Sequence, residues 1–117
     1  MNTQDEAQIL DAIAKWLERD VRPKARELEK KDEYPEAMVE TMKQLGLFGA
    51  TIPQEYGGSG LGLTEATVIM EEINRAGGNS GACHGQMYNM GTLLRHGSDA
   101  QKRRYLPAIA AGELRLQ

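Results

Sequence analysis

The sequence has 117 residues, of which 40% are hydrophobic and 26% are charged, and this suits one ordered domain with a modest core. A formal net charge of −3 and a pI near 5.4 exclude a general nucleic-acid binder, which needs a basic face for phosphate contacts. The basic cluster Lys102-Arg103-Arg104 falls in the last turn of a short predicted helix, where it complements the helix dipole.

The single cysteine, Cys83, cannot form an internal disulfide and favours a reducing compartment, for which the cytoplasm is the default. The first ten residues carry Asp5 and Glu6 where a signal peptide would carry positive charge. No apolar run approaches the roughly 20 residues that a membrane span requires. We therefore expect a soluble, cytoplasmic protein without a membrane span.

The first predicted helix begins at Thr3, which has the spacing of a capping box with Glu6. Apolar residues recur on one face of this helix as far as about Glu29. They are Ile9, Ile13, Leu17, Val21 and Leu28, with Leu10 and Trp16 widening the stripe. Because Pro23 removes one amide and crowds the carbonyl of Arg19, we expect either a bent helix or two helices.

A second helix is predicted after the polar run 29–33, since Pro35 suits the first turn of a helix. Gly46 is well placed to end this helix in a left-handed conformation. The buried stripe of the second helix comprises Met38, Met42 and Leu45.

Residues 45–63 form a connector that follows neither a helical nor a strand period. Four glycines lie within six residues of it: Gly57, Gly58, Gly60 and Gly62. A nucleotide-binding loop is excluded, because the sixth position of each candidate glycine pattern is Leu63 or Glu65 and no Gly-Lys-Ser/Thr ending follows. The pattern predicts a turn-rich connector in which Gly57 or Gly58 occupies a positive-φ turn.

A third helix is predicted to be capped by Thr64 and to end at residues 76–79. Its inward residues are Val68, Ile69 and Ile73. Ser80 is predicted to cap a fourth helix that runs to about Arg95. Three glycines, each costing up to ~1 kcal/mol relative to alanine, weaken the fourth helix, so tertiary packing must hold it. These glycines are Gly81, Gly85 and Gly91.

The last predicted helix is short and starts at Ser98, which has capping-box spacing with Gln101. Pro107 is expected to start a final turn that Gly112 ends. Residues 114–117 alternate like the start of a strand that has no partner in this sequence. We therefore expect the sequence to be a fragment of a longer chain. The sequence predicts an all-α bundle of five to six helices with a glycine-rich connector, ending at the start of an orphan strand.

Few residues could carry chemistry by themselves. Cys83 and His84 cannot act as thiol and base, because neighbours on a helix point about 100° apart, and Cys83 is predicted to be a buried hydrophobe. His84 and His96 lack the spacing of a helical metal pair, and no cluster completes a site, so no metal is predicted. Met87 and Met90 suit either the core or the adaptable lining of an apolar pocket.

Several segments, in their order and spacing, resemble the amino-terminal helical domain of the acyl-CoA dehydrogenase family. They are residues 45–49, residues 52–61, Met70-Glu71-Glu72, the small residues after Ala76, residues 96–102, Tyr105-Leu106-Pro107 and Gly112-Glu113. The resemblance begins near Val21 and continues to the end of the chain. It assigns residues 1–113 to the helical domain and residues 114–117 to the start of a missing middle β-domain.

The resemblance implies an FAD-dependent oxidoreductase of fatty acid metabolism that dehydrogenates the α,β bond of an acyl-CoA thioester. It also implies an acceptor of the electron-transfer flavoprotein type and a homo-oligomeric full-length protein. In that family the fourth helix and the loop before it line the acyl cavity. The corresponding pocket candidates are Gly81, His84, Gly85 and Tyr88. Some members place a polar pocket residue near the position of His84, which favours a non-linear or polar acyl group.

The resemblance assigns no catalytic or cofactor-binding residue to this chain, because the family's catalytic glutamate and most flavin contacts lie beyond Gln117. We expect the chain alone to be inactive and to bind no flavin. A standalone all-α interaction module would explain the amphipathic stripes, but not the ordered family-like segments or the orphan strand start. An acyl-CoA oxidase or flavin monooxygenase would share this helical domain and differ in residues further along the chain.

Overall fold

The chain folds into helices joined by short turns. The computed structural model describes residues 3–115, with side chains from residue 4 onward. Within this range there are six α-helices and no strand. They are α1 (Thr3–Trp16), α2 (Arg22–Lys31), α3 (Glu36–Gln44), α4 (Leu63–Arg75), α5 (Gly81–His96) and α6 (Asp99–Ala110). The prediction of an all-α bundle is confirmed.

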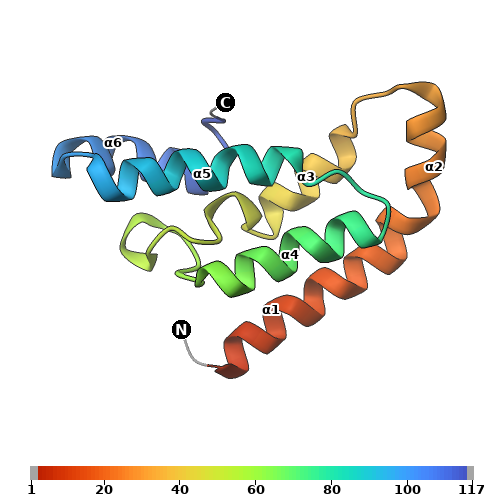
Figure 1. The fold of residues 1–117 in the computed structure, drawn as a ribbon, viewed down its shortest axis with the longest axis horizontal. Coiled ribbons are helices and arrows are strands. Elements are labelled where there is room, and N and C mark those ends of the chain that lie inside the picture. The colour runs from red at the N-terminus through yellow and green to blue at the C-terminus, as the bar shows by residue number, and fades with distance from the viewer. Residues whose placement is uncertain (1–2, 116–117) are drawn as a thin grey trace.

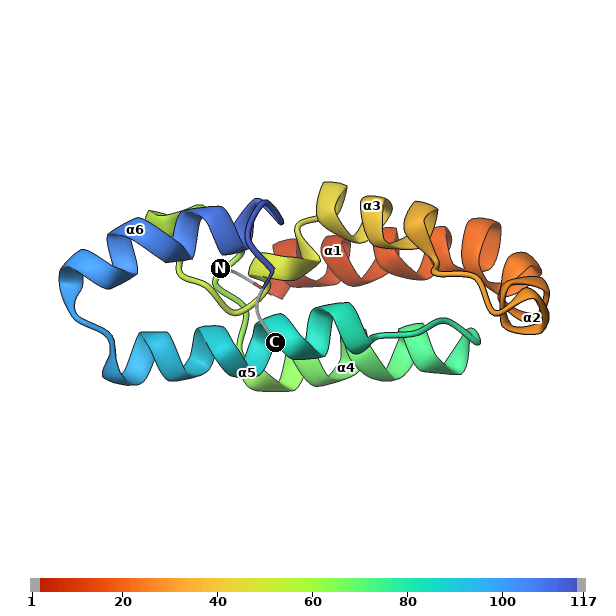
Figure 2. The same cartoon turned by 90° about the horizontal axis from the view of Figure 1, so that it is seen from above.

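The helices are arranged in two layers, as Figures 1 and 2 show. One layer holds α4 and α5, which run antiparallel, and the other holds α1, α3 and α6. Helix α2 turns away from the end of α1 (Figure 1). The connector from α3 to α4 passes from one layer to the other (Figure 2) and includes two 3-10 turns, Leu47–Gly49 and Gln54–Tyr56.

The bend between α1 and α2 is a π-helical turn over Leu17–Val21. The amide of Arg22 donates to the carbonyl of Leu17, five residues back, and Pro23 lies in the first turn of α2. A proline has no amide to donate and its ring crowds the carbonyl four residues earlier, so the wider turn accommodates it. The predicted bend is confirmed. The predicted cap at Thr3 involves a side chain outside the described residues.

The predicted N-cap of α4, Thr64, is wrong by two residues. Helix α4 begins at Leu63, and its N-cap is Gly62, which has an extended backbone and no side chain with which to cap. Thr64 therefore lies inside the first turn, exposed to solvent, instead of preceding the helix. Glu65 is in the first turn as expected, where its charge complements the helix dipole.

The cap of α5 also differs from the prediction. Ser80 is the N-cap residue, but its side chain makes no capping bond and its Oγ instead accepts a hydrogen bond from Asn74 Nδ2 at 2.9 Å. The first amide of α5, that of Gly81, donates to Asn79 Oδ1 at 2.8 Å. Asn79 thus provides part of the capping expected of Ser80, because the hydroxyl is engaged by the end of α4.

Helix α6 has the predicted capping box but not the predicted break. The amide of Gln101 donates to Ser98 Oγ at 3.2 Å, and the Ser98 amide donates to Gln101 Oε1 at 2.9 Å. Pro107 starts no new turn and lies inside one continuous helix. That helix continues because its last turn is buried through Leu106, Ile109 and Ala110. It ends before Gly112, whose φ of 74° confirms the predicted end.

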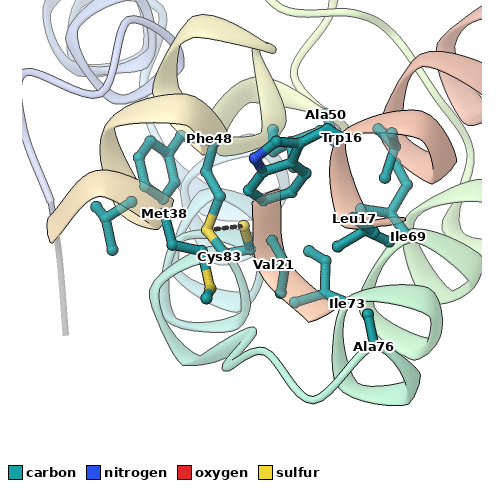
Figure 3. Packing of buried hydrophobic residues seen from close by; sticks show 14 of the residues in the cluster. Trp16, Leu17, Val21, Met38, Phe48, Ala50, Ile69, Ile73, Ala76 and Cys83 are labelled. Atoms are coloured by element: carbon teal, nitrogen blue, oxygen red, sulfur yellow. Dashed lines mark hydrogen bonds between the residues drawn. The ribbon is translucent and has the colours of Figure 1, made fainter. Parts of the chain in front are cut away.

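Two clusters of buried residues form the core, and α5 contributes to both. The larger cluster, shown in part in Figure 3, contains Ile13, Trp16, Leu17, Val21, Met38, Val39, Met42, Leu47, Phe48, Ala50, Leu61, Ile69, Ile73, Ala76 and Cys83. The smaller cluster contains Ile52, Met90, Leu106, Ile109 and Ala110. Met87 packs against both clusters. Packing therefore holds α5 despite its glycines, as the sequence predicts.

The connector is fixed by its own backbone. Its second half folds back on its first half through three amide-to-carbonyl bonds: Ser59 to Gly49 at 3.0 Å, Gly60 to Ile52 at 2.8 Å and Leu61 to Ala50 at 2.8 Å. Gly57 has a φ of 89°, which confirms the predicted positive-φ turn. Gly58 has a negative φ, but a Cβ there would overlap the carbonyl of Ile52. The two glycines are needed for different reasons.

Beyond α6 the chain leaves the helical core without forming a strand in the described range. Leu114 and Arg115 lie in neither a helix nor a strand. The side-chain amide of the buried Gln86 donates to the carbonyl of Leu114 at 2.9 Å and so fixes the path of the chain as it leaves the domain. Residues 116 and 117 lie outside the described residues, so the strand start and the following β-domain stay predictions.

We expect Gly57→Ala and Gly58→Ala each to lower the free energy of unfolding of the 117-residue chain by about 1–3 kcal/mol. The first forces a side chain into a left-handed turn, and the second forces a methyl group against the Ile52 carbonyl. Chemical denaturation measures both. Gly91→Ala is the matched control, because a Cβ there meets nothing within 4 Å and should leave stability unchanged or raise it. Unaltered midpoints for both connector variants would mean that the connector is merely flexible.

Candidate functional site

An apolar groove of about 620 Å³ lies between α4 and α5, with connector residues at its base. Its lining consists of Thr51, Leu61, Leu63, Ala66, Met70, His84, Met87, Tyr88, Gly91, Thr92, Leu94 and Arg95. The hydroxyl of Thr51 donates to Met90 Sδ at 3.0 Å, which ties the connector to α5 below the groove. We call this the α4–α5 groove.

One face of α5 provides most of the groove's lining. His84, Tyr88, Gly91 and Arg95 follow one another at intervals of three or four residues, so they share a face. The buried residues of α5 are Cys83, Gln86 and Met90, which face the core. Because the core fixes the rotation of α5, the His84-to-Arg95 face must look out into the groove.

Two large apolar side chains at the groove are unusually open to solvent. Leu63 of α4 is 78% exposed and Tyr88 of α5 is 55% exposed. Single exposed apolar residues are ordinary, but these two lie on opposite walls of a mostly apolar groove. Such a groove fits an apolar ligand or a further part of a protein better than it fits water.

The rings of His84 and Tyr88 contact each other at one end of the groove. Their centroids are 5.3 Å apart with a tilt of 51°, a favourable geometry for an aromatic pair one helical turn apart. The imidazole has two ring nitrogens and the tyrosine ring carries a hydroxyl, so this part of the wall can accept or donate a hydrogen bond. The sequence candidates His84 and Tyr88 are therefore brought together.

The other two candidates, Gly81 and Gly85, line a different hollow on the α3 side of α5. This second hollow has a volume of about 490 Å³. Its lining consists of Tyr34, Pro35, Val39, Asn79, Gly81, Ala82, Gly85 and Arg115. Arg115 Nη1 donates to Tyr34 Oη at 3.3 Å along its edge. The four candidates thus line two different hollows of the described chain.

The sequence reasoning missed several residues of the groove. Gly91 and Arg95 could have been found, because they continue the helical spacing from His84 and Tyr88. Leu63 and Met70 come from α4, and no local pattern indicates that α4 lies across from α5. The sequence did not decide whether Met87 belongs to the core or to a pocket. In the structure it lines the groove and also packs against both core clusters.

The groove can bind and shield a ligand, but its lining offers no carboxylate that could act as a base. Among the residues that the structure describes, no group of His, Cys, Asp and Glu side chains could hold a metal ion. None of the helices in the described range has the length and hydrophobicity needed to cross a membrane.

Cys83 is a buried hydrophobe, as predicted from its sequence context. Its thiol donates to Met42 Sδ at 3.5 Å inside the larger core cluster, the dashed contact in Figure 3. Burial raises the pKa of this thiol to about 12, because the interior disfavours the thiolate. A thiol in this state is neither a nucleophile nor a metal ligand at neutral pH.

Known proteins resemble this chain over nearly its whole length. The family model "Acyl-CoA dehydrogenase, N-terminal domain" matches residues 3–113. The mitochondrial isovaleryl-CoA dehydrogenase of Pongo abelii is 40% identical over 116 residues. That match covers 95% of this chain and 27% of the relative, so the chain spans only the corresponding fraction of that relative's length.

Two solved structures have the same fold. A probable acyl CoA dehydrogenase from Mycobacterium abscessus superposes with a TM-score of 0.71 at 28% identity, covering 97% of this chain and 31% of the other. A chain in the structure of the electron transferring flavoprotein of Acidaminococcus fermentans has a TM-score of 0.79 at 26% identity, with coverage of 98% and 31%. Both alignments include almost all of this chain, and both solved chains are about three times as long as the aligned part.

The burial of Cys83 predicts an unreactive thiol. At pH 8 a disulfide reagent should modify the folded chain at least about a hundredfold more slowly than the chain in denaturant, because the raised pKa leaves almost no thiolate. The release of the chromophore on reaction measures both rates. Since Cys83 is the single cysteine, all labelling reports on it. Equal rates in the two conditions would contradict the buried position.

Proposed function

This chain belongs to the acyl-CoA dehydrogenase family, and from that premise we propose that it is the amino-terminal helical domain of an FAD-dependent acyl-CoA dehydrogenase. The full-length enzyme would remove a proton from the α-carbon of an acyl-CoA thioester and a hydride from its β-carbon. Bound FAD would accept the hydride. Within that enzyme this chain forms one wall of the acyl pocket.

The observation that carries the proposal is the α4–α5 groove. It is concave, its lining is mostly apolar, and Leu63 and Tyr88 are exposed on its two walls. Ligand pockets have this character, with a few polar groups that orient the bound molecule. Here the polar groups include the imidazole nitrogens of His84, the hydroxyl of Tyr88 and the guanidinium of Arg95.

In this proposal the chain supplies a wall of the acyl pocket, and other parts of the enzyme supply the catalytic groups. The lining contains no carboxylate, and we place the base that takes the α-proton in another part of the protein, as the family resemblance implies. We propose no residue of this chain as a ligand of FAD, because the family resemblance places most flavin contacts beyond Gln117. The wall that this chain supplies excludes water from the thioester and limits how far the acyl group extends.

We further propose a short, branched acyl group as the substrate. The similar protein from Pongo abelii is an isovaleryl-CoA dehydrogenase, and isovalerate is short and branched. Met70 and Met87 give the groove an apolar lining that adapts to an irregular shape. An acceptor of the electron-transfer flavoprotein type and a homo-oligomeric assembly belong to the same proposal.

The first test is the full-length protein, obtained by reading the gene beyond the codon for Gln117. It should purify with bound flavin, and isovaleryl-CoA should bleach the flavin absorbance, whereas the 117-residue chain alone should be helical by circular dichroism and colourless. A stop codon directly after Gln117 would favour a standalone interaction module. Stoichiometric flavin on the short chain would show that the cofactor site lies here, against our assignment.

A pair of variants tests which hollow forms the acyl wall. In the full-length enzyme, Tyr88→Ala should change the ratio of kcat/KM between short and long acyl-CoA substrates by about tenfold or more, because the ring borders the groove. Gly85→Leu fills the second hollow and should leave that ratio unchanged. The reverse pattern, with Gly85→Leu altering the ratio and Tyr88→Ala not, would place the acyl wall at Gly81 and Gly85.

A further inference from the structure

We infer that Gly91 determines the width of the acyl group that the α4–α5 groove accepts, by leaving room for a branch beside the Tyr88 ring. This inference rests on the proposed function, because it assigns a specificity-determining residue to the same site. It concerns a position at which an added Cβ would meet no other part of the described domain within 4 Å. Neither the backbone nor the packing of the domain requires a glycine at position 91. The space needed by a bound acyl group would require one.

The backbone of Gly91 does not require glycine. It lies inside α5 and is not among the positive-φ glycines of the described chain. Any L-residue could adopt this conformation, and alanine would favour the helix more. Gly46, Gly57 and Gly112 differ in this respect, since each has a positive φ that favours glycine.

Packing within the domain does not require glycine at position 91 either. A Cβ built there meets no atom within 4 Å. At Gly97, the next glycine along the chain, a Cβ would lie 2.5 Å from the Leu93 carbonyl oxygen. At Gly49 it would lie 2.8 Å from the Ala110 Cβ. The domain's own atoms explain those two glycines, but they leave Gly91 unexplained.

The space that Gly91 leaves open belongs to the α4–α5 groove. Gly91 lines the groove together with Tyr88, one turn earlier on the same face of α5. A side chain on a helix leans back over the turn that precedes it, so a side chain at position 91 would cover part of the groove next to Met87 and Tyr88. Its absence leaves a gap beside a rigid aromatic ring.

A gap at the side of the groove affects the width of the acyl group that can bind more than it affects the length. A linear acyl chain passes along a groove with little lateral room, whereas a methyl branch needs space to one side of the chain. The flexible thioether of Met87 can adjust to the branch, but the Tyr88 ring cannot bend. The gap at Gly91 is therefore where a branched acyl end fits beside the ring.

The test compares two acyl-CoA thioesters with the same number of carbons, isovaleryl-CoA and pentanoyl-CoA, in the full-length enzyme. Gly91→Val should lower the ratio of kcat/KM for the branched over the linear substrate by about tenfold or more, and Gly91→Ala by a smaller factor. Ala14→Val adds similar bulk on an exposed face of α1 and should leave the ratio unchanged. We expect the ratio to fall stepwise from glycine to alanine to valine at position 91 and to stay unchanged in Ala14→Val.

Two outcomes would overturn the inference, and they are distinguishable. If the unaltered enzyme dehydrogenates acyl-CoA but Gly91→Val keeps the ratio while lowering the melting temperature, the glycine serves contact with another part of the protein. In that case the proposed function stands and only the role of Gly91 fails. If the unaltered full-length protein lacks acyl-CoA dehydrogenase activity, the proposed function fails and the inference fails with it.

Discussion

The path of the connector depends on two glycines whose missing side chains let backbones touch. A Cβ on Gly49 would lie 2.8 Å from the Cβ of Ala110 in α6, and a Cβ on Gly58 would overlap the carbonyl of Ile52. Because these contacts are so close, the connector lies directly against α6, and Ile52 enters the smaller core cluster with residues of α6. The fold of the connector back on itself thus brings Ile52 into that cluster.

The position of α5 follows from this arrangement. Its own glycines give it a poor helix propensity, yet Cys83 is buried in the larger cluster and Met90 in the smaller one. Two anchors on one side of a helix fix its rotation, and the opposite residues are then presented to the space in front of α4. The groove is thus a consequence of core packing, and the His84 and Tyr88 rings are placed by residues of α5 that are buried in the core.

Some local features were predictable from the sequence, whereas several features set by tertiary contacts were not. The Ser98 and Gln101 capping box was found because both partners lie within one turn. Ser80 was assigned wrongly as a capping side chain because Asn74, from the preceding helix, engages its hydroxyl. The family resemblance pointed to α5 as the pocket helix, but spacing alone could not show that α3 and α4 lie on different sides of it. For that reason Gly81 and Gly85 were grouped with His84 and Tyr88, although they line another hollow.

The account's central claim is that the α4–α5 groove forms the wall against which an acyl group lies. A crystal structure of the full-length protein with a bound acyl-CoA tests this claim most directly. We predict that the acyl group contacts the ring of Tyr88 and passes beside Gly91, with the connector beneath it. An acyl group bound instead in the hollow between Gly85 and Arg115, or bound without any contact to α5, would contradict the account.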